Sequence, residues 1–130
     1  CEWCRRGEHP LCTTYGILGE HRRGTFADSV VVPAPNVAKV AASVPDDVAA
    51  AFTLATLTAW RMCVTRAKVQ RGEDVLIWGI GGGVATSALA IARQRGCPVA
   101  VTSRHAWKLD KARALGAGLC VLDQGQDWSK

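Results

Sequence analysis

The sequence predicts an α/β fold, the first half of a doubly wound parallel sheet. From residue 75 onward, short apolar runs alternate with segments of helical spacing, in the order strand, helix, strand, helix, strand. A glycine-rich stretch, residues 79–83, follows the first apolar run directly and opens the first of these helices. This order is typical of a parallel sheet whose strands are joined by right-handed helical crossovers.

The individual elements follow from apolar patterning and from turn residues. Residues 1–24 are polar and rich in glycine turns, and an apolar run ended by Pro33 then predicts a strand. Acidic residues directly after Pro45 mark a helix start, and Gly116 marks a helix end. The expected strands are residues 25–32, 36–40, 75–78, 99–102 and 120–122, and the expected helices are residues 48–67 (one or two helices), 84–94 and 107–115. The run at residues 75–78 is continuous, as in a strand covered on both faces.

The composition limits the classes of protein to which this chain can belong. The chain has 130 residues, of which 48% are hydrophobic and 21% charged, as in soluble globular proteins. No stretch approaches the roughly 20 apolar residues of a membrane span, and the opening lacks the apolar region of a signal peptide. We therefore expect a cytoplasmic protein without a membrane partner. The net charge of +5 comes from scattered Lys and Arg residues without interleaved aromatic residues, which favours a solvated surface over nucleic-acid binding.

The glycine-rich stretch has the position and composition of a phosphate-binding turn. A helix N-terminus presents unpaired N–H groups and attracts phosphate, provided that the preceding turn carries no bulky side chains. Gly79, Gly82 and Ala85 give the pattern G-x-x-G-x-x-A inside a βαβ unit, which predicts dinucleotide binding; the alternative is a purely structural tight turn. The expected cofactor-binding residues of this turn are Gly79, Gly81, Gly82, Gly83 and Val84.

The end of the second strand of this unit indicates which dinucleotide binds. NAD-selective sites place an acidic residue there to hold the ribose 2′-hydroxyl. This chain has Ser103 and Arg104 instead, with Lys108 four residues after Arg104. A hydroxyl and two cations favour a 2′-phosphate, so we expect NADP(H) to be preferred over NAD(H). A role of Arg104 as an ordinary surface residue is the alternative.

Three of the six cysteines crowd the start of the chain. Cys1, Cys4 and Cys12 give the spacing C-x₂-C-x₇-C. In a cytoplasmic protein such a cluster favours a metal site over disulfides. Zinc in a structural site takes four ligands. Either a fourth ligand lies upstream of Cys1, or the cysteines of this loop do not bind a metal.

Taken together, these segments resemble the medium-chain dehydrogenase/reductase family, which includes zinc-type alcohol dehydrogenases and quinone oxidoreductases. The resemblance covers essentially the whole chain, in order. The matching segments are the three N-terminal cysteines, Gly-Thr-Phe-Ala-Asp at residues 24–28, Thr-Ala-Trp at residues 58–60, the glycine turn at residues 79–85, Lys-Leu at residues 108–109, Ala112, and Leu-Gly-Ala at residues 115–117.

The resemblance implies two partial domains. Residues 1–45 would be the C-terminal part of a GroES-like substrate domain, with a structural zinc held by Cys1, Cys4 and Cys12. Residues 46–130 would be the N-terminal part of an NAD(P)-binding Rossmann domain. Complete family members are more than twice this length, so we expect the 130 residues alone to be inactive and to expose apolar surface.

The resemblance also implies an oxidoreductase that transfers hydride between NADP(H) and an alcohol, carbonyl or enone substrate, as a homodimer or homotetramer. Thr58 is a candidate catalytic residue near the nicotinamide. A catalytic-zinc ligand is expected four residues before the Thr-Ala-Trp segment, where this chain has Leu54. That departure raises a zinc-independent quinone or enoyl reductase of the same superfamily as an alternative. A non-enzymatic zinc-ribbon or nucleic-acid-binding module is a third possibility.

Overall fold

The computed structural model describes residues 1–125 and 127. The chain divides into two compact units, Cys1–Lys39 and Val40–Lys130.

The first unit is made of turns and short helices. It contains helix α1 (Glu2–Arg5) and the 3-10 turns η1 (His9–Leu11) and η2 (Ala34–Asn36). The prediction of a strand at residues 25–32 is wrong, and so is that of an extended piece beginning at residue 36, which belongs to η2. A strand needs a hydrogen-bonded neighbour and a covered face. Residues 1–39 offer neither, since Phe26 and Val31 stand almost fully in solvent.

The second unit has the predicted order of helices and strands. Helix α2 begins directly after Pro45, as expected, and continues into the π-helical segment η3. The strands and the two later helices agree with the predicted ranges to within one residue at each end. The elements are α2 (Asp46–Trp60), η3 (Arg61–Arg66), β1 (Val75–Ile77), α3 (Gly83–Gln94), β2 (Val99–Ser103), α4 (Ala106–Ala114) and β3 (Leu119–Leu122).

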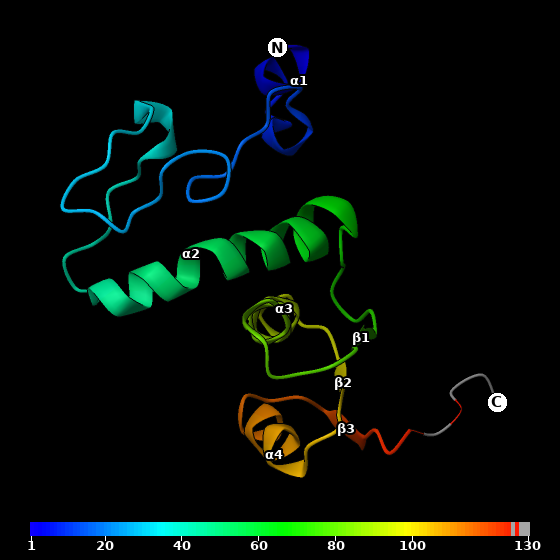
Figure 1. Ribbon diagram of the computed structural model, residues 1–130. Helices are drawn as coiled ribbons and strands as arrows, with labels where there is room; N and C mark the ends of the chain where they lie inside the picture. The colour runs from blue at the N-terminus through cyan, green and yellow to red at the C-terminus, as the bar shows by residue number, and fades with distance from the viewer. Residues whose placement is uncertain (126, 128–130) are drawn as a thin grey trace. The chain divides into compact units, whose positions relative to one another are not determined.

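The three strands form one parallel sheet in the order β1-β2-β3. Helix α3 packs on β1 and β2, and α4 packs on β2 and β3. Figure 1 shows α3 and α4 on the same side of the strands, with α2 lying across α3. The predicted α/β class with a parallel sheet is confirmed.

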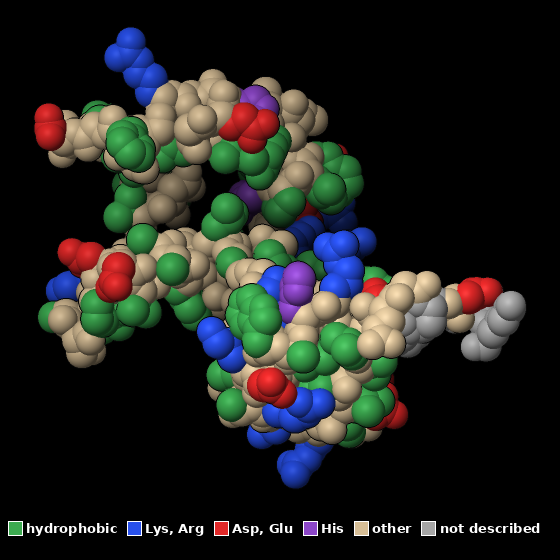
Figure 2. Space-filling view, turned by 60° about the horizontal axis from the view of Figure 1, so that its bottom comes forward, with side chains coloured by type: hydrophobic (Ala, Val, Ile, Leu, Met, Phe, Trp, Pro, Cys, Tyr) green, Lys and Arg blue, Asp and Glu red, His purple; other side chains and the backbone are tan. Residues whose placement is uncertain are grey.

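The core lies between the sheet and this helix layer. Leu89 of α3 and Val101 of β2 are fully buried there. The opposite face of the sheet is open: Leu76, Ala100 and Leu119 share one register row, and the two leucines are about 60% exposed. The prediction that β1 is covered on both faces is therefore wrong, because the described residues place helices on one face only. Figure 2 shows hydrophobic side chains at many places on the surface.

Helix α2 is long and apolar. Together with η3 it forms one 21-residue helical span, Asp46–Arg66, which by length and composition alone could cross a membrane. The expectation that no stretch approaches such a span is thus corrected. One such helix is weak evidence, because core helices of soluble proteins share its length and composition.

Candidate dinucleotide site

The connection between β1 and α3 is a turn that glycine alone can adopt easily. Gly79 and Gly81 have φ of +83° and +120°, in the region that L side chains rarely enter. Thr102 of β2 anchors the turn: its Oγ1 accepts a hydrogen bond from Gly79 N at 3.0 Å, and its carbonyl accepts one from Ile80 N at 2.8 Å. The sheet therefore fixes the backbone of the turn before any ligand binds.

The turn delivers the chain into the N-terminus of α3. Gly82 is the N-cap residue, with extended backbone, and no side chain caps this helix end. A Cβ at Gly82 would meet nothing within 4 Å, so the space in front of the helix is open. Open N–H groups at the positive end of the helix dipole are what a pyrophosphate requires.

The carboxyl ends of the strands and the glycine turn surround a hollow of about 600 Å³, the dinucleotide hollow. It brings together most of the predicted cofactor residues, although these come from separate segments of the sequence. Gly83 and Val84, also expected here, do not line it; they form the first turn of α3. The lining residues are Trp78, Gly79, Ile80, Gly81, Gly82, Thr102, Ser103, Arg104, His105, Lys108 and Asp123.

The polar residues predicted to select the cofactor lie on one side of this hollow. Ser103 is buried, and its Oγ accepts a hydrogen bond from His105 N at 3.1 Å, which leaves its own hydroxyl proton free to donate elsewhere. Arg104 is exposed. The aliphatic part of Lys108 lies against Gly81, where an added Cβ would be 2.7 Å from its Cδ. The region can thus present a hydroxyl and two cations to an anionic group.

Five lining residues were not among the predicted cofactor-binding residues, namely Trp78, Ile80, Thr102, His105 and Asp123, and the roles of Thr102 and Asp123 are visible in the structure. Thr102, 2% exposed, orders the glycine turn, and only the parallel pairing of β1 with β2 reveals that role. Asp123 follows β3, and its backbone N–H donates to Ser103 O at 2.9 Å. A carboxylate there suits a hydroxyl or amino group of a ligand, but not a phosphate. Its position after a strand, like that of Ser103, is the signal that could have identified it.

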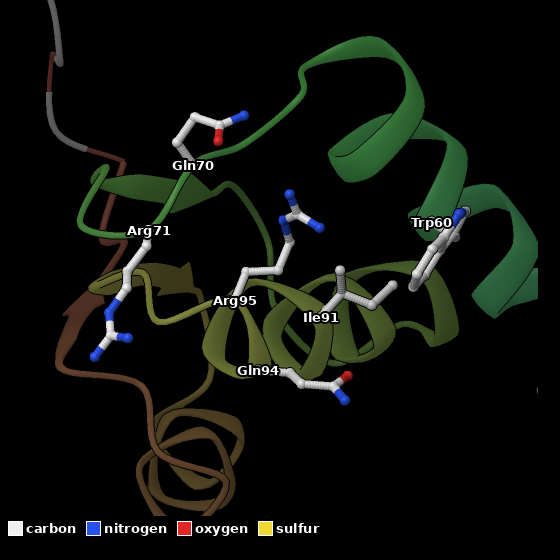
Figure 3. Close-up of a pocket in the computed structure, with 6 residues that line it drawn as sticks. All are labelled: Trp60, Gln70, Arg71, Ile91, Gln94 and Arg95. Atoms are coloured by element: carbon white, nitrogen blue, oxygen red, sulfur yellow. The ribbon is translucent and has the colours of Figure 1, made fainter.

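A second hollow, of about 480 Å³, lies at the other end of α3 (Figure 3). Figure 3 shows Arg95 pointing between Gln70 and Trp60, while Arg71 extends away. Arg95 Nε donates to Val69 O at 2.8 Å. Cations are favoured at a helix C-terminus, where Arg95 lies, and the lining residues of this hollow include neither a glycine nor the start of a helix. Arg95 thus has a structural explanation, and the hollow at the glycine turn remains the candidate site.

The candidate catalytic residue Thr58 does not join the dinucleotide hollow. It lies exposed on α2, and its Oγ1 donates to the carbonyl of Leu54 at 2.9 Å. Leu54 itself is 77% exposed. Its aliphatic side chain has no metal-binding atom. Because Thr58 lies outside the hollow, its catalytic role stays a prediction.

The three N-terminal cysteines converge within the first unit. The Sγ atom of Cys1 lies 3.6 Å from that of Cys4 and 3.8 Å from that of Cys12, and all three lie within 4.8 Å of one another. Zinc–sulfur bonds of about 2.3 Å in a tetrahedron separate the sulfurs by roughly 3.8 Å. The donor set thus fits three corners of a zinc site.

Hydrogen bonding makes two of these thiols unequal. The hydroxyl and backbone of Thr14 lower the pKa of Cys12, with a further contribution from Cys4. The pKa of Cys4 is raised, mainly by its hydrogen bond with Cys12 and then by partial burial. The Cys12 thiolate is therefore favoured over that of Cys4.

Known proteins similar to this chain are oxidoreductases. An L-threonine 3-dehydrogenase of Anaeromyxobacter sp. (strain K) is 40% identical over 125 residues, which cover 93% of this chain and 34% of that protein. The crystal structure of an NAD-dependent alcohol dehydrogenase is 44% identical, with a TM-score of 0.93 over 98% of this chain and 37% of that one. A quinone oxidoreductase of Pseudomonas syringae pv. Tomato is 31% identical, with a TM-score of 0.70 over 75% of this chain and 30% of that one. No family model matches the sequence.

These similarities confirm the resemblance to the medium-chain dehydrogenase/reductase family. The chain is related to such enzymes over nearly its whole length and spans about a third of the length of the curated relatives that it matches. The solved structures also agree with the α/β architecture of the second unit. The GroES-like nature of residues 1–45 stays a prediction.

Proposed function

We propose that this chain forms the NADP(H)-binding part of an oxidoreductase that interconverts an alcohol and a carbonyl compound. The observation that carries the proposal is the hollow in which the glycine turn of residues 79–82 meets Ser103, Arg104 and Lys108. The oxidoreductase class is that of the similar proteins. The cofactor preference rests on the chain's own residues.

The preference for NADP(H) follows from charge. Arg104 and Lys108 line the hollow, and the one carboxylate that does so, Asp123, follows β3 rather than β2. A ribose 2′-phosphate would find two cations and the Ser103 hydroxyl where an NAD site has an acidic residue. NADH is the competing cofactor, since one similar structure is that of an NAD-dependent enzyme.

The residues of this chain would bind and orient rather than react. When bound, the nicotinamide cofactor supplies the hydride chemistry. The open N-terminus of α3 would hold the pyrophosphate, and Thr102 would keep the glycine turn in place for it. Ser103, Arg104 and Lys108 would hold the adenosine end, which fixes the direction in which the nicotinamide points.

A structural zinc on Cys1, Cys4 and Cys12 is part of the proposal. The sulfur separations support it. Such a metal would cross-link the first twelve residues and would take no part in hydride transfer.

A zinc-independent quinone or enoyl reductase is the second candidate. The observation that favours it is Leu54, which stands where the family resemblance places a catalytic-zinc ligand. In that case one zinc per chain, or none, would be found in the intact enzyme, and enone substrates would be reduced faster than alcohols are oxidised.

The third possibility, a zinc-ribbon or nucleic-acid-binding module, gains no support from the similar proteins. The dimeric or tetrameric state is proposed on the family resemblance, and the cytoplasmic location on the composition of the chain.

Titration of the intact protein with NADPH and NADH, followed by nucleotide fluorescence, tests the proposal. We expect tighter binding of NADPH. The substitution Arg104→Gln should weaken NADPH binding about 10- to 100-fold, the effect of a charge-assisted hydrogen bond, and leave NADH nearly unchanged.

Arg113→Gln is the matched control, because it removes the same charge from an exposed arginine that is paired with Asp110 outside the hollow. Equal losses of NADPH affinity in both variants would mean that the preference for NADPH comes from general surface charge. If neither NADPH nor NADH binds the unaltered protein, the oxidoreductase proposal itself fails.

A further inference from the structure

Trp107, at the start of α4, is contacted by two lysines. The ammonium nitrogen of Lys108 is 5.4 Å from the centroid of its indole ring, and that of Lys111 is 5.1 Å away. Both distances lie within the roughly 6 Å over which a cation is attracted to an aromatic face. The indole is 57% exposed, so packing in the core does not explain its position.

In the part of the chain that the structure describes, the indole contacts both ammonium groups and no carboxylate pairs with either of them. The single acidic residue of α4, Asp110, is paired with Arg113 at 2.7 Å. Lys108 lines the hollow together with Arg104, and Lys111 follows three residues later on α4, so positive charge is concentrated in this corner of the second unit although Asp123 also lines the hollow. Such a corner is suited to a group with two negative charges.

Lys108 connects the indole to the dinucleotide hollow. Its aliphatic part lies against Gly81, and it lines the hollow together with Arg104. It also lines a neighbouring hollow of about 340 Å³ that Trp107 and Lys111 border. A lysine side chain has four rotatable bonds, and without a fixed contact its charge would be spread over many positions.

We propose that Trp107 is a positioning residue that determines cofactor specificity: its indole ring holds the Lys108 ammonium where the 2′-phosphate of NADP(H) binds. The inference rests on the proposed function and adds a residue to it. The entropic cost of ordering the Lys108 side chain is incurred in the free protein. Only the cofactor with the 2′-phosphate contacts the ordered ammonium, so only NADP(H) binds more tightly because of it.

The test is a double-mutant cycle in the intact protein, with NADPH and NADH dissociation constants as the readout. Trp107→Leu should weaken NADPH binding about two- to fivefold, the range expected for an exposed cation–π contact, and leave NADH unchanged. Trp107→Phe keeps an aromatic face and should retain part of the preference. In a Lys108→Met background, Trp107→Leu should have no further effect.

Lys111→Met provides the matched control. It removes the other ammonium from the same ring, and Lys111 does not line the dinucleotide hollow, so the NADPH/NADH affinity ratio should change less than with Lys108→Met. Thermal unfolding of each variant checks that the fold is retained.

Three outcomes would overturn the inference: a loss shared equally by NADPH and NADH, no loss at all, or an additive loss in the Lys108→Met background. Each of these leaves the proposed function standing if the unaltered protein prefers NADPH. If the unaltered protein shows no such preference, the NADP(H) proposal fails, and the role of Trp107 fails with it.

Discussion

The two units of the chain are stabilised by different means. No residue of Cys1–Lys39 is buried, whereas the second unit contains a continuous apolar core beneath a parallel sheet. The first unit instead has backbone turns and three converging sulfurs. The order of the second unit therefore comes from hydrophobic burial, and that of the first depends on local turns and, in our proposal, on a metal.

The largest effect should come from opening a cavity in the core. Leu89→Ala removes a fully buried side chain and should lower the free energy of unfolding by about 2–5 kcal/mol. Leu54→Ala makes the same change on α2 at a side chain that is 77% exposed, and should stay within about 0.5 kcal/mol. Urea unfolding followed by far-UV circular dichroism measures both. Similar losses would mean that α2 is more deeply buried than the structure shows.

Zinc removal should affect the first unit alone. Zinc at 100 times its dissociation constant contributes about 2.7 kcal/mol to the state that binds it. Chelation should therefore speed amide hydrogen exchange in residues 1–12 and leave β2 and α3 unchanged. Cys4→Ser should reproduce the chelated pattern without any chelator. Faster exchange in the core strands would show instead that the two units share their stability.

The glycine turn allows stability and binding to be separated within the second unit. Gly81→Ala should cost about 1–3 kcal/mol, because its φ of +120° is strained for any side chain and the new Cβ would meet Lys108. Gly82→Ala has an ordinary φ of −91° and open space around its Cβ, so its melting temperature should hardly change.

Nucleotide titration of Gly82→Ala completes this test. The methyl group would occupy the space into which we propose that the pyrophosphate fits, so binding should weaken although the fold is kept. Unchanged nucleotide affinity in this variant would contradict the placement of the phosphates at α3.

The smallest effect concerns pH. Burial, with a minor contribution from Cys97, raises the pKa of the Cys63 thiol. Because the thiol ionises more readily in the unfolded chain, its contribution to stability is complete below about pH 8.5 and is lost as the pH rises. Cys63→Ala should therefore flatten the decline of the free energy of unfolding between about pH 8 and 10. Parallel curves for the two proteins would show that Cys63 titrates alike in both states.

How far the sequence could predict the structure differs between the same two units. The strands and helices from residue 75 onward were predictable because apolar runs, helical spacing and glycine turns indicate the same elements there. The strand expected at residues 25–32 failed because an apolar run specifies a strand only where a partner strand exists. Thr102 and Asp123 were missed because their roles arise from pairing between strands that are separate in the sequence.

The α/β order, the glycine turn and the cysteine spacing can be predicted from the sequence alone, since each depends on local backbone preference and on residues close together in the chain. Three features emerge only from the packed fold: which face of the sheet is covered, which predicted residues share a hollow, and the contact of Trp107 with both Lys108 and Lys111. Side-chain direction and strand register determine these features, and they are fixed only when the helices pack on the sheet.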